Sequence, residues 1–256
     1  MKRSARATLH RTGRRALTWR PKGAGVEPVS IRALISPLRY DVVVRADFFR
    51  LIEDLRLRDV RRPEDVASVA RAHQYFVWFQ QVAMARFRPW VLADEDLLSQ
   101  QFTERVRSSM NLWSSFRLNG FDRRYPVTLR SASGPRSADS GVVLDRPLHV
   151  GDGGHRLALI LASGADELEP GMYRVDPRPL KELIDNTAVL LPAIPLSVNE
   201  YVRFIAGGFG CPEADPPVEL SGVEGLRDQV RRHRPGTLPE LERVLEIHRM
   251  LPAPRP

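Results

Sequence analysis

The chain has 256 residues, of which 43% are hydrophobic, a formal net charge of +8 and one cysteine, Cys211. This length and composition can bury one good core with a helical subdomain beside it. A single cysteine excludes an intramolecular disulfide and a cluster of thiolate metal ligands, so we expect a reducing compartment and a cytoplasmic location. No apolar run approaches the ~20 residues of a membrane span, and we therefore expect no transmembrane segment.

The positive charge is concentrated at the N-terminus. Residues 1–25 contain eight Lys and Arg and no acidic residue, and removing these eight leaves 31 basic against 31 acidic residues. The rest of the chain is neutral overall, which argues against nucleic-acid binding by the folded part. We interpret residues 1–28 as a disordered basic arm, either a solvated tail or a contact to an anionic surface such as lipid or nucleic acid.

Residues 29–118 are predicted to form a helical region. Apolar residues recur at helical spacing in three segments, so we expect a helical layer over residues 45–118. Pro63 marks the start of the second helix, and Asp94 or Asp96 caps the third. The aromatic residues between 75 and 79 are expected to be mostly core. Two shorter apolar segments of uncertain type precede the layer, at 29–35 and 40–44.

Residues 119–185 are predicted to form a small α+β unit with a mixed sheet. Asn119-Gly120 closes the helical layer, and the order that follows is strand, loop, strand, turn, helix, strand. This order differs from regular βαβ repeats. The predicted strands are 125–129, 142–144, 148–150 and 172–175, followed by a helical turn or two over 179–184.

Residues 186–256 are predicted to be a helical C-terminal extension. Ser197 and Glu200 form a capping-box pattern that opens a helix ending at Gly207-Gly208, and residues 237–240 repeat the pattern. The extension carries little recognisable chemistry.

The segment of residues 151–156, Gly-Asp-Gly-Gly-His-Arg, lies between a predicted strand and a short apolar helix that ends at Gly164. Glycines at a helix start leave backbone N–H groups accessible, and the side chains of His155 and Arg156 add donors beside them. The turn is therefore predicted to bind a phosphate or another anion.

Each residue of this turn also has a purely structural interpretation. Asp152 could cap the helix through N–H groups two or three residues further on. Gly153 and Gly154 could serve only to permit a positive φ. His155 could be a satisfied polar residue and Arg156 a solvated or paired charge. The convergence of these residues on one helix start favours a bound anion.

The turn and its flanks resemble a known superfamily. Gly120 and Pro126-Val127, a short strand, and the run Asp152-Gly-Gly-His-Arg-Leu-Ala ending at Gly164 are similar to the core of the ParB/sulfiredoxin superfamily, over residues 120–175. In that superfamily a D-G-x-H-R turn at a helix start handles nucleotide phosphates. The chain also resembles uncharacterised bacterial members encoded among sugar-transfer and surface-polysaccharide genes, in which a helical region precedes the turn.

The resemblance implies roles for individual residues. Asp152 matches a position near the reacting hydroxyl or a metal, and His155 matches a phosphate-contacting position. The resemblance therefore implies catalytic roles for Asp152 and His155. Contacts to a nucleotide would come from Gly153, Gly154, His155 and Arg156. No metal-ligand set is predicted.

The chain also departs from the superfamily pattern. Gly154 replaces a second histidine of the kinase form, which weakens the case for catalysis more than the case for binding. No cysteine lies in the turn, so we exclude sulfiredoxin activity. Neither an arginine-rich box nor a helix-turn-helix is evident, so DNA partition is disfavoured.

Two hypotheses follow. The first is a nucleotide-dependent phosphotransferase acting on a small molecule or sugar in surface-polysaccharide biosynthesis, with ATP or ADP and Mg²⁺ as cofactors. The second is a non-catalytic module that binds a nucleotide or sugar phosphate. In both, the partner is a nucleotide or a phosphorylated small molecule rather than nucleic acid.

Overall fold

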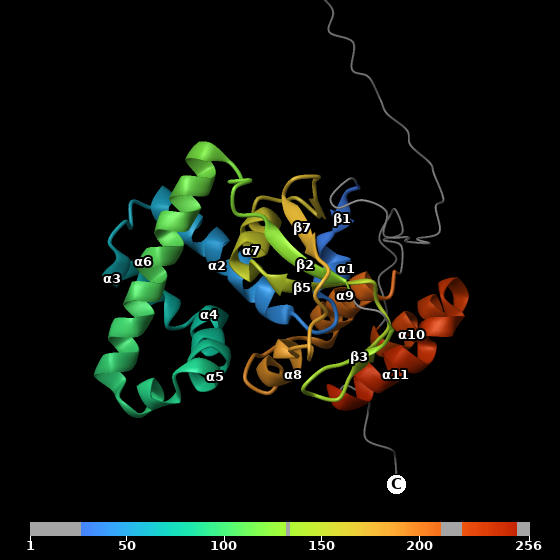
Figure 1. Ribbon diagram of the computed structural model, residues 1–256. Helices are drawn as coiled ribbons and strands as arrows, with labels where there is room; N and C mark the ends of the chain where they lie inside the picture. Colours follow the sequence, from blue (N-terminus) through green and yellow to red (C-terminus); the bar gives the residue numbers. More distant parts are fainter. Residues whose placement is uncertain (1–26, 132–133, 211–221, 250–256) are drawn as a thin grey trace, which may run out of the picture.

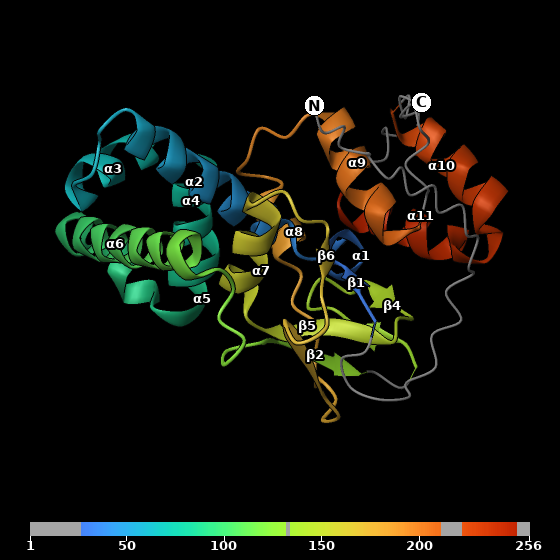
Figure 2. The same ribbon diagram turned by 90° about the horizontal axis from the view of Figure 1, so that it is seen from above.

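The structure is a computed structural model that describes residues 27–131, 134–210 and 222–249 (Figure 1). Helices and small sheets are mixed in the described residues, which confirms the predicted α+β class. The helices of residues 40–119 lie on one side of the central sheet, and the helices of residues 198–247 lie on the other (Figures 1 and 2). Residues 1–26 of the predicted basic arm and Cys211 lie outside the described residues.

The helical region begins with two short elements, the strand β1 (Val29–Ser30) and the helix α1 (Ile31–Ile35). The uncertain segment 40–44 is the first part of a long helix. The elements that follow α1 are α2 (Tyr40–Leu57), α3 (Pro63–Ala70), α4 (Gln74–Trp78), a π-helix (Phe79–Met84), α5 (Ala85–Phe87), a 3-10 turn (Pro89–Ala93) and α6 (Glu95–Asn119).

The predicted helix start at Pro63, the cap at Asp94 and the helix end at Gly120 are confirmed, but the second of the three predicted helical segments is divided into α3, α4 and the π-helix. Pro63 occupies the first turn of α3, where its missing N–H removes no intrahelical hydrogen bond. The Asp94 carboxylate accepts from the backbone N of Leu97 at 3.0 Å and caps α6. Gly120, at φ 71°, ends that helix.

The central sheet has three strands in the order β5-β2-β7. Strand β2 (Val127–Ser131) pairs antiparallel with β5 (Leu148–Asp152) and parallel with β7 (Tyr173–Asp176), so the sheet is mixed as expected. Two minor sheets join β1 to β6 (Glu167–Leu168) and β3 (Arg136–Ser137) to β4 (Val143–Leu144). The helix α7 (Gly154–Ala162) follows β5 and packs against α2 through a buried apolar face.

The predicted helical turn over 179–184 is wrong. Leu183 instead forms a parallel bridge with Ala138: its N donates to Ser137 O at 3.1 Å, and its carbonyl accepts from Asp139 N at 2.9 Å. Tertiary pairing with the strand-like segment therefore overrides the local helical signal.

The C-terminal helices have their own core. The capping box at Ser197 and Glu200 is confirmed, with both reciprocal hydrogen bonds present. The second predicted capping box is wrong, because Thr237 Oγ1 donates to the carbonyl of Arg234 at 3.0 Å instead of capping the helix. The elements are α8 (Asn186–Leu190), α9 (Val198–Gly208), α10 (Gly222–His233), a 3-10 turn (Pro235–Thr237) and α11 (Leu238–Ile247). Among the described helices, none combines the length and apolarity needed to cross a membrane.

Candidate functional site

The 151–156 segment joins a strand to a helix, as sequence analysis predicted: it contains the end of β5, Gly153 and the first turn of α7. Gly153 adopts φ 92°, which turns the chain from the strand into the helix, and Gly154 is the first helical residue. The Asp152 carboxylate accepts from the N–H of Gly153 at 2.6 Å, and its side chain is 78% exposed. Asp152 therefore stabilises the turn from its solvent-exposed side.

Arg156 also points away from the interior of the site. Its Nη1 donates to the backbone carbonyls of Tyr125 and Pro126, the second at 2.9 Å, and its Nη2 lies 3.5 Å from Asp152 Oδ2. These bonds fasten the start of α7 to the segment before β2. Of the side chains in the 151–156 turn, only His155 is among the residues that line a large pocket.

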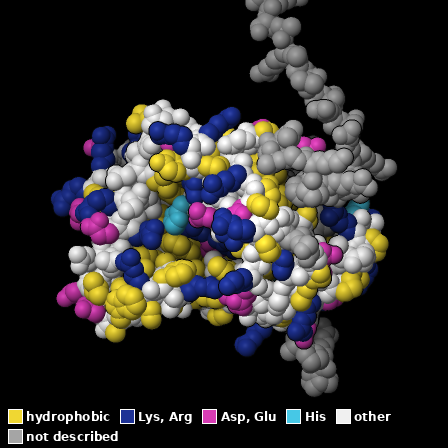
Figure 3. All heavy atoms as spheres, viewed as in Figure 1, with side chains coloured by type: hydrophobic (Ala, Val, Ile, Leu, Met, Phe, Trp, Pro, Cys, Tyr) yellow, Lys and Arg dark blue, Asp and Glu magenta, His cyan; other side chains and the backbone are white. Residues whose placement is uncertain are grey.

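This pocket, which we call the arginine pocket, has a volume of about 550 Å³. Basic side chains surround a hollow with a largely apolar floor (Figure 3). Its walls come from α2, the π-helix, α5, α6, α7 and the start of α8. Its charged lining residues are Arg39, Arg45, Arg86, Arg88, Arg105, Asp41 and Glu104.

Arg39 and Arg45 are held in place by one buried carboxylate. Arg39 donates through Nε to Asp41 Oδ1 at 2.8 Å and through Nη2 to Oδ2 at 3.1 Å, and Arg45 Nη2 donates to the same Oδ2. Burial lowers the pKa of Arg39 to about 10. Burial, with the like charges of Arg39 and Arg105, lowers the pKa of Arg45 to about 9. Both remain cations at neutral pH.

Gly154 lets these guanidinium groups reach the first turn of α7. A Cβ at Gly154 would lie 2.9 Å from both terminal nitrogens of Arg45 and 3.2 Å from Nη2 of Arg39. Two cations therefore stand against a helix N-terminus, which itself carries partial positive charge. An anion bound there would relieve their repulsion.

His155 lies beside these guanidinium groups and is a neutral hydrogen-bond donor. Its Nδ1 lies 3.3 Å from Nη1 of Arg45, and because a guanidinium only donates, Nδ1 is the acceptor and Nε2 carries the proton. Burial, and then the charges of Arg45, Arg105 and Arg39, lower the pKa of His155 well below its usual value of 6.5. The buried Nε2 has no partner among the described residues.

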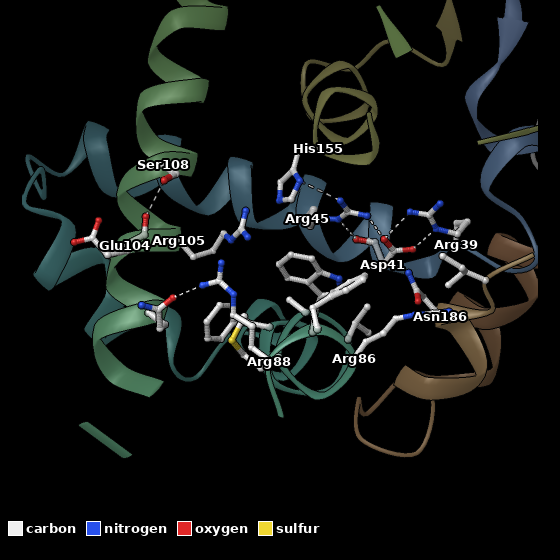
Figure 4. A pocket seen from close by; sticks show the side chains of 18 residues that line it. Arg39, Asp41, Arg45, Arg86, Arg88, Glu104, Arg105, Ser108, His155 and Asn186 are labelled. Carbon is white, nitrogen blue, oxygen red and sulfur yellow. Dashed lines mark hydrogen bonds and ion pairs between the residues drawn. The ribbon is translucent and has the colours of Figure 1, made fainter. Parts of the chain in front are cut away.

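Two further donors are uncommitted. Trp78 is 4% exposed, and its Nε1 is buried with no partner among the described residues. Its ring lies under the guanidinium of Arg45, at 5.0 Å, and edge-on to His155. Arg105 makes no side-chain hydrogen bond or ion pair within the described ranges, and it extends from α6 toward His155 (Figure 4).

Comparison with protein-family models, with curated proteins and with solved structures found no match. The superfamily resemblance of the turn therefore stays a prediction, and the geometry of the arginine pocket carries the functional argument.

The remaining wall of the arginine pocket is apolar. It consists mainly of the π-helix residues Phe79, Val82, Ala83 and Met84, together with Phe87. Trp78 and Phe79 are buried, as expected for the aromatic run, and they line the pocket as well. The pocket thus has arginine side chains on one side and an apolar wall on the other.

The pocket does not supply a ligand set for Mg²⁺. The described residues hold no group of three or more His, Cys, Asp or Glu side chains that could hold a metal ion. Asp41 is engaged by two arginines, and Glu104 is paired with Arg107. Mg²⁺ in phosphate sites is usually held by one or two carboxylates together with water and ligand phosphates, and both carboxylates of this pocket are already paired with arginines.

Proposed function

We propose that the protein binds a phosphorylated small molecule in the arginine pocket, with the phosphate against His155, Arg45 and Arg105. One observation carries the proposal: five arginines and two carboxylates line the pocket, each of these carboxylates is already paired with an arginine, and Arg88 and Arg105 have no carboxylate partner among the described residues. The uncommitted groups Arg105, His155 Nε2 and Trp78 Nε1 are all donors. Such a lining selects an anion with several acceptor oxygens.

The size of the arginine pocket and its apolar wall favour an organic phosphate over a bare ion. A volume of about 550 Å³ lies within the range of small-molecule sites. A base, sugar or similar group would cover Phe79 and Val82 while the phosphate contacts the arginines. A nucleotide and a sugar phosphate both meet this description. The surface-polysaccharide context rests only on the resemblance of the turn.

Binding without turnover is favoured over phosphoryl transfer. Transfer needs a carboxylate that positions the acceptor hydroxyl or a metal ion beside the reacting phosphate. Asp152, predicted for that role, is solvent-exposed and does not line the pocket, and Asp41 is committed to Arg39 and Arg45.

The test is calorimetric titration with inorganic phosphate, pyrophosphate, ADP and ATP, each with and without Mg²⁺. We expect at least one compound to bind, and we expect Arg105→Gln to weaken binding about 10- to 100-fold, because a hydrogen bond to a charged group is lost. The matched control is Arg243→Gln, which removes an exposed arginine paired with Glu246 on α11. Absence of binding by every phosphate compound, or equal effects of the two variants, would contradict the proposal. ATP turnover that Asp152→Ala abolishes would instead establish the phosphotransferase.

A further inference from the structure

A second, smaller cavity adjoins the arginine pocket. It has a volume of about 80 Å³ and lies beside β5, and Arg39 and Ile184 line both cavities. We call it the inner cavity. A volume of this size accommodates about two or three water-sized groups. It can hold the end of a small ligand but is too small for a ring.

The inner cavity contains a buried histidine of the opposite hydrogen-bonding character to His155. His149 on β5 is 7% exposed, and its Nε2 is buried with no partner among the described residues. Burial, with the charges of Arg146 and Arg136, lowers the pKa of His149 to about 4, against a hydrogen bond to the backbone of Arg146 that raises it. A backbone contact that favours the protonated ring is one to a carbonyl, so Nδ1 carries the proton and Nε2 is an acceptor.

The other polar groups of this cavity do not satisfy that acceptor. Arg146 donates to the carbonyls of Ala33, Ser36 and Gly208. The hydroxyl of Ser36 donates to the carbonyl of Ile205 at 3.0 Å. A buried acceptor without a donor is unfavourable, and a ligand donor would relieve this. Arg39 and Arg146 outnumber Glu182, the one carboxylate among the described lining residues, so the cavity carries net positive charge and disfavours an ammonium group. A neutral hydroxyl is the donor that fits.

We propose that the inner cavity is the subsite for a hydroxyl-bearing end of the ligand whose phosphate occupies the arginine pocket. The inference rests on the proposed function and narrows its ligand to a phosphorylated sugar or polyol. His155 donates to the phosphate, His149 accepts from the hydroxyl, and Arg39 lies in the wall between them. His149 on β5 and His155 on α7 are six positions apart in the sequence. One continuous segment of the chain therefore positions the contacts to both ends of the ligand.

The competing class of ligand is an alkyl phosphate, such as a lipid headgroup with its chain on the apolar wall. That wall continues to Phe87, which is exposed. An alkyl chain would leave the acceptor of His149 unsatisfied, which is why we favour the polyol.

The experiment compares three probes that share one phosphate monoester and six carbons, with inorganic phosphate as a fourth probe. Sorbitol 6-phosphate and glucose 6-phosphate carry hydroxyls, hexyl phosphate carries none, and inorganic phosphate reports on the arginine pocket alone. The variant His149→Phe keeps the ring shape and removes the acceptor. We expect it to weaken at least one hydroxylated probe about tenfold while leaving hexyl phosphate and inorganic phosphate unchanged.

A second variant, Leu180→Phe, enlarges a half-buried side chain in the lining of the inner cavity and keeps His149. We expect the same selective loss from it, and it tests the proposal even if His149→Phe does not fold. Equal or tighter binding of hexyl phosphate by the unsubstituted protein, or equal losses for all probes in both variants, would overturn the hydroxyl subsite and leave the proposed function intact. Failure of every probe, together with failure of pyrophosphate, ADP and ATP, to bind would overturn both.

Discussion

Nδ1 of His155 lies 3.3 Å from Nη1 of Arg45, at the point where the first turn of α7 meets α2. This contact fixes the histidine as the Nε2-protonated tautomer, because the guanidinium has no lone pair to offer. The same contact, with burial, keeps the ring neutral at physiological pH. A cationic pocket therefore contains a histidine that donates a hydrogen bond without adding a charge.

The first prediction concerns the pH dependence of phosphate binding. Because the pKa of His155 is lowered below 6.5, the ring is already neutral at pH 6, and raising the pH to 8 removes no positive charge from it. Affinity for a phosphate monoester should rise from pH 5 to 7, as the ligand's second proton dissociates near about pH 6, and then stay level. Calorimetric titration across this range checks the profile. A fall in affinity between pH 6 and 8 would show that His155 binds as an imidazolium.

Two substitutions of His155 test whether its N–H or its aromatic ring contributes to phosphate binding. His155→Gln supplies an amide N–H and should retain much of the affinity, whereas His155→Phe should lower it about tenfold. Equal losses in both variants would contradict a role as a neutral donor.

Sequence analysis could predict the local features of this site because they are determined by neighbouring residues. Gly153 turns the chain, α7 begins at Gly154, and Pro63 and Asp94 start their helices, all through contacts within a few positions. The 237–240 signal failed because Thr237 is the last residue of a 3-10 turn and its hydroxyl donates to the carbonyl of Arg234.

The arginines of the pocket could not be predicted in the same way. Asp41 and Arg45 have the i,i+4 spacing of an ordinary helical ion pair, and Arg105 resembles a solvated base on a long helix. Their convergence depends on how α2 packs against both α7 and α6. Successive helical residues also diverge by about 100° around the axis. His155 therefore faces the pocket, while Arg156 reaches the carbonyls of Tyr125 and Pro126.

The second prediction concerns the two glycines of the turn. Gly154→Ala is compatible with a helical backbone, but its Cβ would meet the guanidinium groups of Arg45 and Arg39. We expect phosphate affinity to fall about tenfold while the free energy of unfolding changes by less than about 1 kcal/mol. Gly153→Ala combines φ 92° with a Cβ 3.1 Å from the Cα of Val127, and should destabilise the fold by about 1–3 kcal/mol.

Gly164→Ala is the matched control for backbone strain. Its φ is 89°, and an added Cβ would meet nothing within 4 Å. Urea unfolding should therefore show a smaller loss of stability for Gly164→Ala than for Gly153→Ala. Unchanged phosphate affinity in Gly154→Ala would indicate that Arg39 and Arg45 do not need their observed positions.

The third prediction concerns Asp152 and Arg156, the two predicted site residues outside the pocket. Asp152→Ala removes an exposed carboxylate and should change phosphate affinity by no more than about twofold. Arg156→Ala removes donors to two backbone carbonyls and should lower the free energy of unfolding by about 1–2 kcal/mol, with less than about threefold loss of affinity. A loss of affinity in Arg156→Ala as large as that in His155→Phe would instead support the phosphate contact predicted from the turn.

The fourth prediction concerns the buried pair that joins the C-terminal helices to the rest of the chain. Nε2 of His248 lies 3.1 Å from Oδ2 of Asp185, and both side chains are fully buried. Nδ1 of His248 lies 2.8 Å from the hydroxyl of Tyr201, and Asp185 also caps α8 through the N–H of Ala188. Because Asp185→Ala leaves His248 Nε2, the hydroxyl of Ser140 and the N–H of Ala188 without their acceptor, it should lower the free energy of unfolding by about 2–5 kcal/mol.

The matched control is Glu246→Ala, which removes the exposed partner of Arg243 on the same helix and should change stability by less than about 1 kcal/mol. His248→Phe keeps the ring volume and leaves Asp185 with its bonds to Ala188 and Ser140, so its loss should lie between the other two. Urea unfolding at pH 7 measures all three variants. Equal stabilities for Asp185→Ala and Glu246→Ala would mean that the packing of the C-terminal core, and not this polar network, holds α9 and α11 in place.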